Sequence, residues 1–152
     1  PYIAPQAIQN RLDRIHDELD IPVLIRSVAI SSPREQIQAD RLRDLLILFY
    51  SHPAVVGFSM SGIWDLTAPL PKAGLFRERF VIKPAGKMFD DLLRNQWWTR
   101  QTIELTPEDA GVVEFNGFHG DYDITVKAGA ETVTETFFLG PRGENSLVVE
   151  LE

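Results

Sequence analysis

Apolar residues recur at helical spacing in three stretches of the first two thirds of the chain. In residues 6–19 they are separated by four, three and four positions, which places them on one face of a helix: Ile8, Leu12, Ile15 and Leu19. Residues 36–50 and 84–98 repeat the pattern, with charged residues at intervening positions. The pattern therefore predicts three amphipathic helices.

The second of these helices has a recognisable start. Ser32 is followed by Pro33 and, three positions after the serine, by Glu35. The serine can cap the helix, the proline suits its first position, and the glutamate can reach back to form a capping box. His52 and Pro53 mark the end, because the residue before a proline disfavours helix. His52 is expected to act there as a cap or as a partner of the helix dipole.

Two stretches between the helices, 21–30 and 55–63, are almost continuously apolar. Such runs are typical of buried parallel strands, and strands that alternate with helices indicate βα units. Two parallel strands alone leave open edges and an uncovered apolar face. The segment is therefore expected to need further strands from elsewhere, and to aggregate or stay molten when expressed alone.

From residue 99 the pattern changes to a period of two, which is typical of strands with one buried face. Turn residues separate five short predicted strands, which cover residues 102–105, 111–115, 122–127, 132–139 and 147–151. The chain is therefore predicted to have two domains, an α/β domain over 1–98 and a small all-β, sandwich-like module over 99–152.

The composition narrows the classes of function. The 152 residues include no Cys and carry a formal net charge of -7. The lack of Cys excludes a disulfide framework and a Cys-based zinc site, and the negative charge argues against a nucleic-acid partner. Neither a membrane span nor a signal peptide is expected from the sequence. Because His16, His52 and His119 are scattered without ligand spacing, neither a metal site nor a cofactor is expected.

Several motifs occur in an order that resembles a known family. They are Ile21-Pro22-Val23, Gln38-Ala39-Asp40, His52-Pro53-Ala54-Val55-Val56-Gly57, Gly62-Ile63-Trp64-Asp65 and Lys83-Pro84-Ala85-Gly86-Lys87-Met88-Phe89. This series looks like the C-terminal half of glycoside hydrolase family 10, the endo-β-1,4-xylanases. Phe115-Asn116-Gly117-Phe118-His119-Gly120-Asp121-Tyr122 is similar to the β module that follows the catalytic domain in plant and invertebrate members.

The resemblance implies a fold class, partners and a location. It makes 1–98 the C-terminal portion of a (β/α)8 TIM barrel and 99–152 the β-sandwich-like module that follows. The missing barrel strands would come from an N-terminal portion of the same protein or from another chain. The resemblance also implies an extracellular or secreted protein whose ligand is a polysaccharide.

The resemblance also locates the catalytic positions, and these are substituted. Retaining glycosidases use two carboxyl groups about 5 Å apart, one as acid/base and one as nucleophile. In the family the nucleophilic Glu and a supporting Asp end the strand that matches 21–30, and here Ser27 and Ala29 occupy those positions. The acid/base Glu belongs to a strand outside this sequence. A serine without a base is a poor nucleophile for an anomeric carbon, and Arg26 opposes the developing positive charge.

Two positions near the second strand bear on sugar binding. Where the family usually has a Trp over the sugar, this chain has Ser61. Trp64 remains and could stack on a sugar face, and the alternative is a core residue under the loop that follows. Trp64, Ser61 and Arg26 are the expected substrate-binding residues.

Three hypotheses about function remain open. The first is a catalytically silent relative of a xylanase that binds carbohydrate or serves as a structural extracellular component. The second is the C-terminal chain of a cleaved but active β-1,4-glycanase, whose acid/base lies in a separate N-terminal piece. The third is a carbohydrate-binding β module, although alternation assigns most of its aromatic residues to an inward face.

Overall fold

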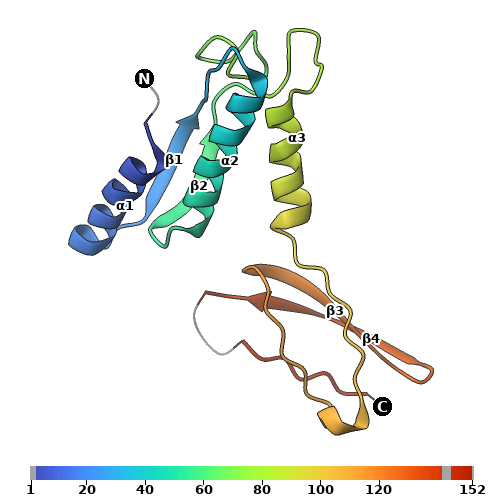
Figure 1. The fold of residues 1–152 in the computed structure, drawn as a ribbon. Coiled ribbons are helices and arrows are strands. Elements are labelled where there is room, and N and C mark those ends of the chain that lie inside the picture. The colour runs from blue at the N-terminus through green and yellow to red at the C-terminus, as the bar shows by residue number, and fades with distance from the viewer. Residues whose placement is uncertain (1–2, 142–144, 152) are drawn as a thin grey trace. The chain divides into compact units, whose positions relative to one another are not determined.

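The computed structural model describes residues 3–141 and 145–151 of the chain. These residues form two compact units, of which the first ends at Leu93 and the second begins at Arg94 (Figure 1). The change in sequence pattern lies slightly later, between residues 98 and 99.

The first unit alternates helix and strand. Its elements are α1 (Pro5–Leu19), β1 (Val23–Val28), α2 (Glu35–Ser51), β2 (Val55–Met60) and α3 (Pro84–Asp91), and a π-helical turn, Leu92–Gln96, follows α3. The three predicted helices and two predicted strands are confirmed, although both strands and the third helix are shorter than expected. No helix in the described part of the chain is long and apolar enough to cross a bilayer.

Strands β1 and β2 pair in parallel, as their apolar composition predicted. Val23 lies opposite Val55 and Val28 lies opposite Met60, but the register shifts twice between these pairs. The second shift falls between Ile25 and Val28. The parallel pairing brings the carboxyl ends of both strands, and the loops that follow them, to the same edge of the sheet.

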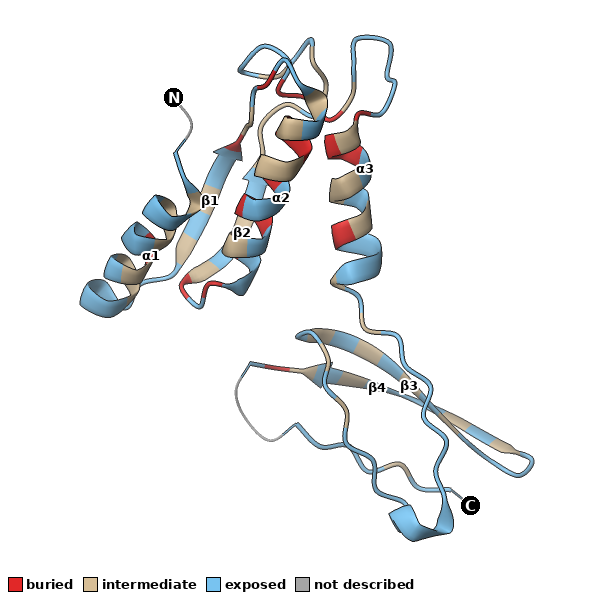
Figure 2. Cartoon of the chain, in the orientation of Figure 1, coloured by how far each residue is buried: buried red, intermediate tan, exposed pale blue. Residues whose placement is uncertain are grey.

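The core of the first unit is built around α2. Its buried apolar residues recur at helical spacing: Ala39, Leu42, Leu45, Leu46 and Phe49. They pack where α2 meets α3 and β2 (Figure 2). Full burial of a leucine or phenylalanine contributes about 1.5–3 kcal/mol, so this face is the main source of stability of the unit.

The predicted capping box at the start of α2 is wrong. The helix begins at Glu35, and its N-cap residue is Arg34, which makes no side-chain cap. The Ser32 hydroxyl instead accepts the Arg34 N–H at 3.2 Å. The Glu35 carboxylate pairs with Arg77, a residue 42 positions away, and that long-range contact takes the place of the local cap.

Part of the β1–β2 sheet is uncovered. Leu24 in β1 is 60% exposed and Val56 in β2 is 69% exposed, although both belong to apolar strands. The sheet has two strands, so each strand also keeps one unpaired edge in the described part of the chain. We call Leu24, Val56 and these two edges the bare sheet face.

The second unit contains one antiparallel hairpin. Strand β3 (Gly120–Ala128) pairs with β4 (Glu131–Leu139) in unbroken register, from Gly120 opposite Leu139 to Ala128 opposite Glu131. Gly129 enters the turn at a φ of 60°, which glycine adopts without strain. The predicted strands at 122–127 and 132–139 are therefore confirmed, whereas those at 102–105, 111–115 and 147–151 are wrong.

The predicted fold class is also wrong. The described residues form a small mixed α/β fold with three α-helices and two sheets of two strands each, and they contain neither a TIM-barrel portion nor a β-sandwich. A barrel requires many tilted strands closed on one another, and two parallel strands cannot produce that curvature. A sandwich requires two packed sheets, whereas the second unit has a single hairpin.

Candidate functional site

The candidate site lies where β1 and β2 end. In parallel sheets, ligands bind at the carboxyl ends of the strands, because the loops there converge. Residues 29–34 follow β1 and residues 61–83 follow β2, so both loops leave from this edge. The Ser61 N–H donates to the Val28 carbonyl at 3.1 Å, which places Ser61 next to the end of β1.

Ser27 has an unusual backbone. Its φ is 62°, in the left-handed region that residues with a side chain seldom adopt, and it lies within the second register shift of the sheet. Its N–H donates to the Ser59 hydroxyl at 3.4 Å. Ser27 and Arg26 are exposed, and Ala29 is half-buried. The strand therefore presents a hydroxyl and a guanidinium at its end, and it holds the hydroxyl in a strained conformation.

This strain leads to a prediction about stability. We expect Ser27→Gly to stabilise the first unit by about 1 kcal/mol, because glycine removes most of the cost of the left-handed conformation. Ser61→Gly is the matched control and should destabilise slightly, since Ser61 has no positive φ. Urea unfolding of both variants gives the comparison. A Ser27→Gly variant less stable than the parent chain would contradict the strained conformation.

The loop over 61–83 is folded tightly on itself. The Ile63 carbonyl accepts the N–H groups of Leu75 and Phe76 at 2.7 and 3.0 Å. Gly62 (φ 66°) and Gly74 allow close chain crossings, because a Cβ on either would lie 2.5 Å from backbone atoms of the facing segment. The loop is thus an ordered structure built over the end of β2.

A buried ion pair holds the inside of this loop. The Lys83 ammonium lies 3.1 Å from an Asp65 carboxylate oxygen, and their side chains are 1% and 15% exposed. Lys83 also donates to the Lys72 carbonyl at 2.9 Å, and Asp65 accepts the Gly74 N–H at 2.9 Å. The buried Gln38 amide of α2 donates to the Gly74 carbonyl at 3.1 Å. The network joins the loop to α2 and to the start of α3.

A second ion pair holds the outside of the loop. Arg77 donates to both carboxylate oxygens of Glu35, at 2.8 and 2.7 Å. The two hydrogen bonds and the positive charge lower the pKa of Glu35 below its ordinary value of 4.5. The same carboxylate raises the pKa of Arg77. The segment around Arg77 is therefore fastened to the first turn of α2.

The lowered pKa of Glu35 predicts how this pair depends on pH. A carboxyl whose folded-state pKa is depressed contributes stability above its unfolded value, and that contribution is lost as the pH falls through the folded pKa. Glu35→Gln should therefore lower the thermal midpoint at pH 7, and its deficit should shrink as the pH falls below 4.5. Glu18→Gln, in the exposed Arg14–Glu18 pair, is the control. A Glu35→Gln deficit that is unchanged between pH 7 and strongly acidic solution would refute this assignment.

The Trp64 side chain makes its contacts within the loop that follows β2. Its indole N–H donates to the Arg77 and Glu78 carbonyls, both at 3.0 Å. The ring of Phe80 stacks on it, with 4.6 Å between centroids and 11° between planes. Trp64 is half-buried, whereas Phe80 is 67% exposed. The aromatic surface that solvent meets on this stack therefore belongs largely to Phe80, which the sequence pattern did not single out.

The buried histidine lies at the opposite end of the sheet. His52 precedes β2, accepts the Ala54 N–H on Nδ1 at 3.1 Å, and has Nε2 3.1 Å from an Asp13 carboxylate oxygen. The ring of His16 meets it edge to face. The six residues of β2 separate this cluster from the carboxyl end by roughly 20 Å. His52 therefore ties α1 to the start of β2 and cannot act as a base for Ser27.

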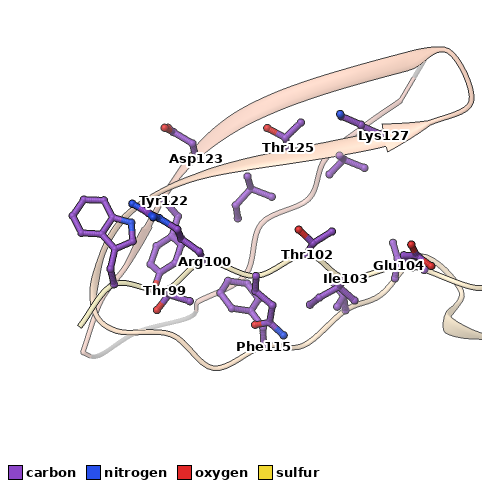
Figure 3. Close-up of a pocket in the computed structure, with 16 residues that line it drawn as sticks. Thr99, Arg100, Thr102, Ile103, Glu104, Phe115, Tyr122, Asp123, Thr125 and Lys127 are labelled. Carbon is purple, nitrogen blue, oxygen red and sulfur yellow. The ribbon is translucent and has the colours of Figure 1, made fainter. Parts of the chain in front are cut away.

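The second unit contains an open groove. It has a volume of about 1280 Å³ and lies between the extended segment 98–105 and β3 (Figure 3). The rings of Phe115 and Tyr122 line it and meet edge to face, with centroids 5.9 Å apart. None of the buried apolar residues of the described chain belongs to this unit. Phe115 and Tyr122 therefore line a groove, and the aromatic residues of this unit do not form the buried core that alternation predicted.

The chemistry available at the candidate site is narrow. Two carboxylates occur in the described loops that follow the two strands, Asp65 and Glu78, and a third, Glu35, is the first residue of α2. Glu35 is held by Arg77 and Asp65 by Lys83, while Glu78 is exposed. The described arrangement offers a serine hydroxyl, but no imidazole to act as its base and no pair of free carboxylates. The residues that sequence reasoning missed are Phe80 and the members of the two ion pairs.

Sequence similarity relates this chain to known proteins. No family model matches the chain. It is 29% identical to endo-1,4-beta-xylanase 2 of Arabidopsis thaliana over 145 residues, which cover 95% of the chain and 13% of that protein. It is 26% identical to endo-1,4-beta-xylanase 3 of the same plant over 131 residues, 86% of the chain and 17% of the relative. It is 32% identical to anti-sigma-I factor RsgI6 of Acetivibrio thermocellus over 122 residues, 78% of the chain and 16% of the relative.

These similarities establish a xylanase-like relationship and a glycoside hydrolase-like origin over most of the chain. The chain spans between 13% and 17% of the length of these relatives.

Proposed function

We propose that this chain is a xylanase-like segment that binds a β-1,4-linked polysaccharide without hydrolysing it, in an extracellular setting. The observation that carries the proposal is Ser27 at the end of β1. A retaining glycosidase needs two carboxyl groups, and an inverting enzyme needs two as well, at a wider separation. The described loops at this edge offer Glu78 as the one carboxylate without an ion-pair partner.

The electrostatics of the site support the same conclusion. Cleavage of a glycosidic bond develops positive charge on the sugar ring, which a carboxylate stabilises and a cation opposes. Arg26 is exposed next to Ser27, and the hydroxyl of Ser27 is neutral. The strand end therefore lacks the anion that this transition state requires. Hydroxyl and guanidinium groups can still form hydrogen bonds with the hydroxyls of a bound sugar.

Binding to polysaccharide can be tested apart from catalysis. We expect the native chain to be retarded during electrophoresis through a gel that contains soluble xylan, and to run freely through a gel that contains dextran. Reducing sugar should not accumulate in the xylan gel. Equal mobility in both gels would contradict the glycan-binding role.

A second candidate, the active cleaved glycanase, is favoured by one observation. The bare sheet face of Leu24, Val56 and the unpaired strand edges is suited to further strands from another polypeptide. We propose that such a polypeptide covers it, either as another part of the same protein or as a separate chain. Co-purification of a second fragment, together with xylan hydrolysis by the assembled material, would favour this candidate over the silent one.

A further inference from the structure

We infer that Phe80 is a sugar-stacking platform, fixed in place by Trp64 and by the Arg77–Glu35 ion pair, for the ring face of a neutral β-1,4-linked glycan. The inference rests on the proposed glycan-binding function and assigns that function to a residue. It begins from the backbone of the segment 77–81. The Arg77 N–H donates to the Val81 carbonyl, and the Phe80 N–H donates to the Arg77 carbonyl, both at 2.9 Å.

These two hydrogen bonds close a three-residue turn whose last position is Phe80. Its φ is 56°, in the left-handed region where such turns ordinarily place glycine. A phenylalanine there is a conformational outlier and costs free energy relative to glycine. Strain of this kind collects at sites that bind ligands, because the surrounding structure must hold it in place. Phe80 is nevertheless 67% exposed, so burial of its ring does not account for the strain.

The Phe80 ring is held in place by Trp64, which packs against one of its faces. Trp64 stacks on one face of Phe80 at 4.6 Å, with the two planes 11° apart. The Trp64 N–H is satisfied by the Arg77 and Glu78 carbonyls, so the indole is anchored to the same turn. The bidentate Arg77–Glu35 pair fastens the turn to α2. The result is a flat aromatic surface whose position is set before any ligand arrives, which reduces the entropy lost on binding.

The occupant follows from the shape and polarity of this surface. One exposed ring is far smaller than the roughly 800 Å² that each partner buries in a stable protein interface. It matches the face of a single pyranose unit, whose C–H bonds pack on an aromatic ring. Glu78 and Arg79 precede Phe80 and are exposed, so their polar ends are available to the hydroxyls at the rim of a sugar. A neutral chain of pyranose units fits this combination.

The test is a titration of the 152-residue chain with xylohexaose and cellohexaose, followed by tryptophan fluorescence at a protein concentration below the micromolar range in which the chain is expected to self-associate. Phe80→Ala should weaken binding at least 10-fold, and Phe80→Trp should restore it. Phe138→Ala is the matched control, because Phe138 is 62% exposed on β4 in the other unit. It should bind as the parent chain does.

Phe80→Gly separates binding from folding. Glycine suits the left-handed position, so this variant should keep the urea midpoint close to that of the parent chain and still lose binding. A parent chain that binds neither oligosaccharide would overturn both the proposed function and this inference. A parent chain that binds while Phe80→Ala binds within twofold of it would overturn the inference alone and leave glycan binding to another surface.

Discussion

Asp65→Ala is expected to destabilise the first unit by about 3 kcal/mol or more, because it leaves the buried Lys83 ammonium without its counter-ion. Lys83 is 1% exposed, so water cannot replace the lost carboxylate. The change also removes the acceptor of the Gly74 N–H. A loss of this size is more than a 100-fold shift in the unfolding equilibrium, and urea unfolding of the first unit measures it.

Two further variants test the reason for this loss. Asp65→Asn combined with Lys83→Met removes both charges and keeps an oxygen for the Gly74 N–H, so it should cost less than half as much as Asp65→Ala. Glu18→Ala, in the exposed Arg14–Glu18 pair, should change stability by no more than about 0.5 kcal/mol. A double variant as unstable as Asp65→Ala would mean that lost packing, and not an unpaired charge, causes the effect.

The second large effect concerns the bare sheet face. We expect the 152-residue chain to self-associate at micromolar concentration, because Leu24, Val56 and the unpaired edges of β1 and β2 can pair with another copy. Leu24→Lys combined with Val56→Thr should keep the chain monomeric, since a charge at this face opposes sheet pairing. Light scattering during size-exclusion chromatography gives the mass of each species.

Leu19→Lys provides the control for this experiment. Leu19 is 59% exposed at the end of α1, so it matches Leu24 in residue type and exposure but lies outside the sheet. It should leave self-association unchanged. A parent chain that is a monodisperse monomer with a sharp, cooperative melting transition would contradict the expectation that this face needs a cover.

The local pattern of apolar and polar residues was sufficient to predict the helices and strands of the first unit. The spacing of Ile8, Leu12, Ile15 and Leu19 predicts α1 because helical periodicity is a property of neighbouring residues. The apolar runs that became β1 and β2 likewise predicted parallel pairing. In the second unit the period of two located β3 and β4, which are joined by a short turn at Gly129 and pair without a distant partner.

Features set by long-range contacts were not predictable in the same way. Glu35 has the spacing of a capping box, but its carboxylate accepts a hydrogen bond from Arg77 in the loop after β2 instead of capping α2. The barrel and sandwich failed for a related reason, since each depends on strand pairings that no short pattern specifies. The resemblance to the xylanases suggested a barrel and a sandwich. The chain is similar to a xylanase in sequence, but its described residues form neither of these two folds.

The candidate site likewise contains residues that the sequence predicted and residues that it did not. Ser27, Ser61 and Trp64 were predicted because the resemblance assigns a role to each position. Asp65 and Lys83 are 18 positions apart in a loop without periodicity, so their pairing had no local signal. Nothing in the sequence pattern marks Phe80 as left-handed, since that conformation is usually given to glycine.

We propose that Ser27, standing where the resemblance places a carboxylate, leaves this chain without glycosidase chemistry. The most direct measurement is the release of reducing sugar from xylan, and of phenol from aryl β-xylosides and cellobiosides, by the 152-residue chain, both alone and together with any second polypeptide that co-purifies with it. We predict no turnover above the uncatalysed rate for the parent protein, for Ser27→Ala or for Glu78→Gln, and a gain of turnover for Ser27→Glu where an acid/base is supplied. Turnover by the parent protein that disappears in Ser27→Ala or in Glu78→Gln would contradict the account.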